Sequence, residues 1–240
     1  MTNSGVPIPQ RSVDAAADSN QGDIECQRSL QQAVLLSLRN RLFKSKCTYY
    51  HRRNRLFDQQ AHTSDIHWVD PDDITYITRY AGQLEYGHPY LDAGAFDKFE
   101  RTGAVVGGTW DRLTVEFSEL YIYQALDNHF NREVPWTETT FFNETLEAIE
   151  SGTRPWGCRS RDDLEQRCKD ISRLYERIER TGYKSQRDLG KHPVDEVNVN
   201  IGRYGDLLFN DGRHRLSIAK LLNIDEIPVR ILAVHEQYLD

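Results

Sequence analysis

The clearest signals for secondary structure lie between Val197 and Leu232, in the stretch "VNVNIGRYGDLLFNDGRHRLSIAKLLNIDEIPVRIL". Its first five residues alternate strictly between apolar and polar, which predicts a half-buried strand. Glycines then mark two turns, and Ile227-Pro228 leads the last apolar run. The elements predicted from this stretch are, in order, a strand over Val197–Ile201, a turn over Arg203–Asp206, a strand over Leu207–Phe209, a helix over Arg213–Leu222 and a strand over Ile227–Leu232.

Three basic or titratable side chains follow the second glycine turn. Arg213, His214 and Arg215 come directly after Gly212 and open the predicted helix. The first N–H groups of a helix have no partner within it and lie at the positive end of its dipole, so they bind phosphate or carboxylate readily. Arginine adds charge-assisted hydrogen bonds. Asp211, just before the turn, suits Mg²⁺ held against phosphates or the orientation of a histidine.

A structural interpretation of the same residues competes with the anion site. Asp211 can cap the helix, and the two arginines can extend over its surface with their charged ends in water. This explains any one residue as well as a ligand does. The whole cluster at one glycine turn favours anion binding.

A long helix is predicted upstream of this stretch. Ser160 can cap it, Asp162 and Asp163 suit its first turn, and Gly182 suits its end. Farther upstream the predicted elements are a disordered tail over residues 1–23, a helix over 24–46, loops and short helices over 47–110 with a strand at Ala104–Val106, a helical block over Phe117–Phe130 and a helix over Thr139–Ile149. The expected fold class is therefore α+β, with a mostly helical region over residues 24–159 and a small α/β unit over 160–240.

The C-terminal unit resembles the ParB/sulfiredoxin nucleotide-binding fold, over about residues 165–235. In that family a helix ending in glycine precedes a strand, a glycine-rich turn and a second strand, and a G-x-x-R signature then opens a helix. The matching positions here are Gly182, Val197–Ile201, Gly212-Arg213-His214-Arg215, Ala219 and Ile227-Pro228-Val229. The resemblance implies a bound nucleotide, ATP or another, with Mg²⁺.

Departures from the family pattern distinguish its branches. Sulfiredoxins place a catalytic cysteine, and ParB-type partition proteins a glutamate, where this chain has Arg213. The "DGRHR" box is most similar to the DGHHR box of the small-molecule kinases in the family. Those kinases also use a glutamate from the first helix region, for which Glu176 and Glu179 are the nearby candidates.

Two functional hypotheses follow from the residues and the resemblance. The first is phosphotransfer from a nucleotide to a small hydroxylated acceptor, which depends on positioning and on neutralising charge. His214 and Arg215 would then hold phosphates, Asp211 would bind Mg²⁺ or orient the acceptor, and Glu176 or Glu179 would serve as the base. The alternative is a ParB-like protein that binds nucleic acid or acts as a nucleotide-dependent switch without catalysis.

Charge is unevenly distributed along the chain. The net charge is −7, from 30 basic and 37 acidic residues, yet the segment from Cys26 to Phe57 holds eight basic residues and no acidic one. This basic segment has three interpretations: contact with anionic lipid, contact with nucleic acid, or packing against the acidic remainder of the chain. Arginine outnumbers lysine by 23 to 7, which with the acidic excess is typical of a salt-adapted organism.

Other features bound the class of protein. No run of eighteen apolar residues is present, and the N-terminus lacks the pattern of a signal peptide. The four cysteines form no C-x-x-C pair, so we expect free thiols in a cytoplasmic protein.

Overall fold

The computed structural model describes residues 66–78, 96, 101–191 and 193–239, together with positions 38, 41, 42, 45 and 49. The chain divides into two compact units, residues 1–45 and 46–240. All seven strands of the described chain lie in the second unit. The predicted tail and most of the basic segment lie outside the described residues. Within the predicted N-terminal helix, Leu38, Arg41, Leu42 and Ser45 are helical.

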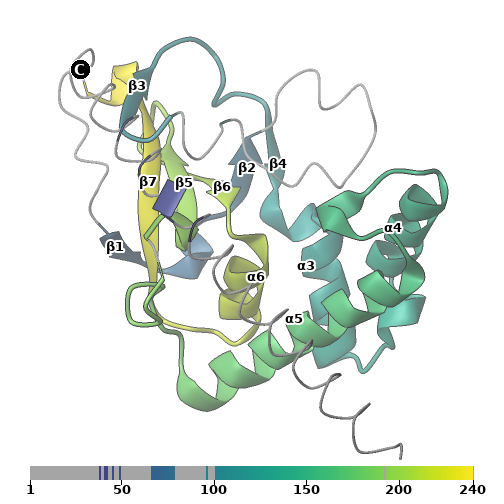
Figure 1. Ribbon diagram of the computed structural model, residues 1–240. Helices are drawn as coiled ribbons and strands as arrows, with labels where there is room; N and C mark the ends of the chain where they lie inside the picture. The colour runs from purple at the N-terminus through teal and green to yellow at the C-terminus, as the bar shows by residue number, and fades with distance from the viewer. Residues whose placement is uncertain are drawn as a thin grey trace, which may run out of the picture. The chain divides into compact units, whose positions relative to one another are not determined.

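A mixed seven-stranded sheet organises the second unit (Figure 1). Its strands run in the order β1-β7-β5-β6-β2-β4, and β3 also pairs with β7. The parallel pairs are β5–β7, β3–β7 and β2–β6, whereas β1–β7, β5–β6 and β2–β4 are antiparallel. The strand bounds are β1 Ile66–Val69, β2 Tyr76–Thr78, β3 Ala104–Val106, β4 Thr114–Glu116, β5 Val197–Ile201, β6 Leu207–Asp211 and β7 Ile227–His235.

The coarse prediction of a mixed fold of helices and strands is confirmed, but the sheet extends across the expected boundary at residue 160. β1, β2, β3 and β4 come from residues 66–116 and pair in one sheet with β5–β7. β1, β2 and β4 are a correction to the helices and loops expected upstream. Each has only three or four residues, too few to show a period of two, and each pairs with a partner strand instead.

The helices are α3 Tyr121–Leu126, α4 Thr140–Glu150, α5 Arg161–Thr181 and α6 Arg213–Leu221. The last three begin and end close to their predicted bounds. The helical block predicted over Phe117–Phe130 is α-helical only in its middle, between a 3₁₀ turn at Phe117–Glu119 and a π-helical turn at Asp127–Asn131. The Ser160 hydroxyl accepts a hydrogen bond from the Asp163 N–H at 3.2 Å, and α5 ends at Gly182 with φ 75°. α6 lies between the sheet and the other helices, in contact with β5, α3 and α5 (Figure 1). None of the helices in the described part of the chain is long and apolar enough to cross a membrane.

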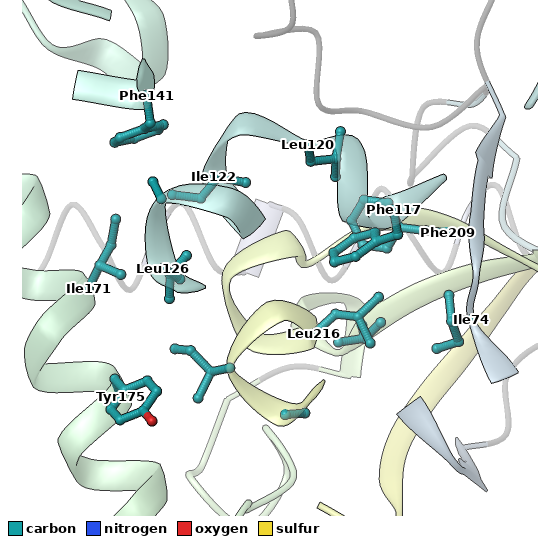
Figure 2. Close-up of a cluster of buried hydrophobic side chains, with 14 of the residues drawn as sticks. Ile74, Phe117, Leu120, Ile122, Leu126, Phe141, Ile171, Tyr175, Phe209 and Leu216 are labelled. Carbon is teal, nitrogen blue, oxygen red and sulfur yellow. The ribbon is translucent and has the colours of Figure 1, made fainter. Parts of the chain in front are cut away.

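The main hydrophobic core joins α6 to the sheet on one side and to α5 on the other. Figure 2 shows Phe117 and Phe209 beside Leu216 of α6, with Ile171 and Tyr175 of α5 on the opposite side. All five side chains are buried. Because residues from three segments distant in sequence share this core, the position of α6 depends on contacts across the unit.

Strand β5 differs from its predicted form, because its polar face is buried too. Asn198 and Asn200 are both fully buried. Asn198 accepts a hydrogen bond from Arg230 Nε at 2.7 Å, and Asn200 donates one to Asn210 Oδ1 at 3.1 Å. Asn210 also bonds the backbone of Phe96, so a segment distant in sequence covers this face. The alternating pattern therefore marks two buried faces, one apolar and one hydrogen-bonded.

A buried ion pair connects the β3–β4 loop to the β5–β6 turn. The Asp111 carboxylate accepts hydrogen bonds from the backbone N–H and the Nε of Arg203, at 3.0 and 2.8 Å. Burial would raise the pKa of Asp111, but these hydrogen bonds outweigh it and lower the pKa to about 2. His235, at the end of β7, is buried beside the pair, with its Nε2 3.8 Å from Asp111 Oδ1.

Candidate anion-binding site at the start of helix α6

The turn that leads into α6 requires glycine. Gly212 has φ 99° and ψ 25°, in the left-handed region that favours glycine. A Cβ at this position would lie 3.0 Å from the Cα of Val197, in β5. The close approach packs the turn before α6 against β5, with one residue between the end of β6 and the start of α6.

A cavity of about 510 Å³ lies at this helix start. Its walls come from the C-terminal half of α5, the segment 182–191 and the first residues of α6. The lining combines basic side chains with apolar ones. The lining residues are Asp170, Leu174, Arg177, Ile178, Arg180, Thr181, Gly182, Tyr183, Lys184, Gln186, Leu189, Lys191, Gly212, His214 and Arg215.

Four of the basic residues in the lining have no ion-pair partner within the part of the chain that the structure describes. Arg177, Arg180, Lys184 and Lys191 are exposed, and among the described residues none of them forms an ion pair. By contrast, Arg161 pairs with Glu165 at 2.9 Å near the other end of α5. The positive charge that lines the cavity is therefore available to a ligand.

Arg215 is held by a buried carboxylate that the sequence analysis did not single out. Its Nη1 lies 3.3 Å from Oε2 of Glu196, whose side chain is fully buried. The backbone N–H of Gln186 donates to the other carboxylate oxygen. Burial raises the pKa of Glu196, although Gln186 and Arg215 act in the opposite direction. Arg215 lines the cavity, with part of its charge offset by Glu196. Little in the sequence marks Glu196 as a functional residue, because its only distinctive feature is its position directly before the strand that begins at Val197.

His214 lines the cavity as a neutral group. Burial, reinforced by the neighbouring charges of Arg213 and Arg167, lowers the pKa of His214 well below 6.5. Within the described chain its Nε2 and the hydroxyl of Tyr183 are buried without a hydrogen-bond partner. Burial also raises the pKa of Tyr183 to about 12. The expected cationic role of His214 is thus replaced by that of a neutral imidazole.

Arg213 lies outside the cavity. Its guanidinium carbon lies 5.0 Å from the centre of the Trp156 ring, a cation–π contact. Burial lowers the pKa of Arg213 to about 9, so it stays charged at neutral pH. The residues of the motif therefore have different surroundings in the folded protein. Gly212, His214 and Arg215 line the cavity, whereas Arg213 packs against the indole of Trp156.

The residues predicted for catalysis and metal binding are not brought together at the cavity. Asp211 ends β6 in register with Asn198, and it does not line the cavity. Glu176 and Glu179 are exposed on α5 and do not line it either. In the part of the chain that the structure describes, no three His, Cys, Asp or Glu side chains form a metal-binding group. A Mg²⁺ ion at Asp211 would need most of its ligands from phosphates and water.

Comparison with known proteins identifies no family for this chain. No protein-family model matches it, and neither does a curated protein or a solved structure. The resemblance to the ParB/sulfiredoxin fold stays a prediction that rests on the residues quoted above.

Proposed function

We propose that this protein binds a phosphate-bearing small molecule of about the size of a nucleotide in the cavity at the start of α6. The observation that carries the proposal is a group of four basic side chains that line one cavity with the helix N-terminus and have no ion-pair partner among the described residues: Arg177, Arg180, Lys184 and Lys191. Unpaired cations and helix N-termini are the groups that bind phosphate in proteins.

The size and remaining lining of the cavity suit a nucleotide. Small-molecule sites commonly have volumes of roughly 300–1,000 Å³, and this cavity has about 510 Å³. Leu174, Ile178 and Leu189 supply apolar surface that a base or sugar can cover. The ring of Tyr183 adds an aromatic contact. ATP, ADP and CTP are therefore the first ligands to test.

We place binding ahead of phosphotransfer because neither glutamate proposed as the base lines the cavity. The carboxylate that contacts Arg215 is Glu196, which the backbone N–H of Gln186 also holds. A phosphotransfer reaction would need an acceptor whose hydroxyl enters the cavity at the start of α6. The nucleic-acid alternative rests on the ParB resemblance and on the basic segment 26–57, most of which lies outside the described residues.

Isothermal titration with ATP, ADP and CTP, each with and without Mg²⁺, tests the proposal. The decisive variant is Arg177→Gln/Arg180→Gln, and its matched control is Arg161→Gln/Lys169→Gln. Both remove two exposed positive charges from α5, but only the first pair lines the cavity. We expect the first variant to bind about tenfold or more weakly and the control to bind like the wild type. Absence of nucleotide binding by the wild type, or equal losses in both variants, would overturn the proposal.

A further inference from the structure

The charges that line the cavity indicate whether its ligand binds as a free anion or as a Mg²⁺ complex. Resting on the proposed function, we infer that the cavity selects a polyphosphate chain as the free anion, with side-chain cations rather than Mg²⁺ neutralising its charge. The ligand class is a nucleoside triphosphate or another compound with at least three linked phosphates.

The number of available cations sets the preferred ligand charge. Five basic side chains line the cavity against one carboxylate, that of Asp170. Only Arg215 among the five has an ion pair in the described structure, with Glu196. A nucleoside triphosphate carries about four negative charges when free and about two as its Mg²⁺ complex. Four unpaired cations are matched better by the free anion.

The positions of these cations suit a chain of phosphates better than one phosphate. Arg177 and Arg180 are three residues apart on α5, so they project from one face of the helix. Lys184 follows the helix end, and Lys191 closes the segment beyond it. These side chains and the start of α6 border the same cavity. A single phosphate can contact only some of these four cations at once.

The same lining is unfavourable for a divalent cation. The Asp170 Oδ1 atom already accepts hydrogen bonds from Gln166 Nε2 at 3.0 Å and Arg173 Nη1 at 2.9 Å. Asp211, the predicted Mg²⁺ ligand, lies outside the lining. Mg²⁺ would therefore compete with the arginines and lysines for phosphate oxygens, and their positive charges would repel it. Added Mg²⁺ should weaken binding here.

The first test titrates the full-length protein with inorganic orthophosphate, pyrophosphate and tripolyphosphate in EDTA, and then with ATP in EDTA and in excess Mg²⁺. We expect the Kd to fall about tenfold or more from orthophosphate to tripolyphosphate, and to rise about fivefold for ATP when Mg²⁺ is added. Equal affinity for all three phosphates, or tighter ATP binding with Mg²⁺, would overturn the inference. If ATP binds in either case, the proposed function stands. If no nucleotide binds, both fail.

Two variants separate a built polyphosphate site from general attraction to a basic surface. Lys184→Gln/Lys191→Gln should remove most of the preference for tripolyphosphate, whereas Arg161→Gln/Lys169→Gln should retain it. Asp170→Asn, which removes the lining carboxylate, should strengthen tripolyphosphate binding about two- to fivefold. A weaker affinity in Asp170→Asn that appears only with Mg²⁺ would indicate a metal ligand and contradict the inference.

Discussion

Replacing Gly212 by alanine tests whether the turn at the start of α6 depends on its close approach to β5. Two costs add. An L-residue in the left-handed region costs about 1–2 kcal/mol, and Gly212 has φ 99°. The new Cβ would also lie 3.0 Å from Val197 Cα and 3.3 Å from Val197 Cγ2. Forcing an extra methyl against a packed strand adds about 1 kcal/mol or more. We expect Gly212→Ala to lower the free energy of unfolding by about 2–4 kcal/mol.

Gly152→Ala is the matched control. Gly152 has φ 89°, and a Cβ there would meet no atom within 4 Å. It therefore carries the backbone cost alone, about 1–2 kcal/mol. Equilibrium unfolding in guanidinium, followed by circular dichroism, measures both variants against the wild type. The reasoning is refuted if Gly212→Ala is no more destabilising than Gly152→Ala, because the contact with β5 would then contribute nothing.

Three further predictions concern buried titratable groups. Because hydrogen bonds from Arg203 lower the pKa of Asp111 from 3.8 to about 2, the wild type should lose stability as the pH falls through that range. Asp111→Asn should be less stable at neutral pH but lose less between those values in acid unfolding, and an unchanged acid profile would contradict this. The pKa of His214 is lowered well below 6.5, so the unfolded chain takes up a proton there that the folded chain does not, and stability falls below pH 6.5. His214→Gln should remove that part of the loss, whereas an NMR titration of His214 near pH 6.5 would argue against a buried neutral ring. Burial raises the pKa of the Cys158 thiol, and that of Cys168 to about 12, so both should resist iodoacetamide in the folded protein and react on unfolding. Peptide mass spectrometry would detect early alkylation, which would show that these thiols are accessible.

Local signals predicted the elements around the site well. The caps of α5, the left-handed glycine before α6 and the apolar run of β7 are all properties of neighbouring residues. β6 and β7 continue beyond their predicted ends, to Asp211 and His235, because pairing with adjacent strands extends them. The short strands β1, β2 and β4 escaped notice since their hydrogen-bond partners lie elsewhere in the chain.

The motif from Asp211 to Arg215 shows what cannot be predicted from neighbouring residues alone. The sequence predicted a basic glycine turn at a helix start, and both the turn and the helix are present. It did not predict that Arg213 would pack on Trp156, which is distant in sequence, or that His214 would be neutral. Burial decides both outcomes, and burial depends on which other segments pack around the turn.

By itself, then, the sequence determined the order of strands, turns and helices in the C-terminal part and the presence of basic residues where α6 begins. These follow from backbone conformation and from periodicity along neighbouring residues. Only the tertiary structure decided which of those charges face a common cavity. It brings Lys184 and Lys191 beside α6, pairs Arg215 with Glu196 and covers the asparagines of β5. These contacts join residues that are far apart in the chain. Each of them lowers the free energy of the folded state only when the whole sheet and its helices have assembled.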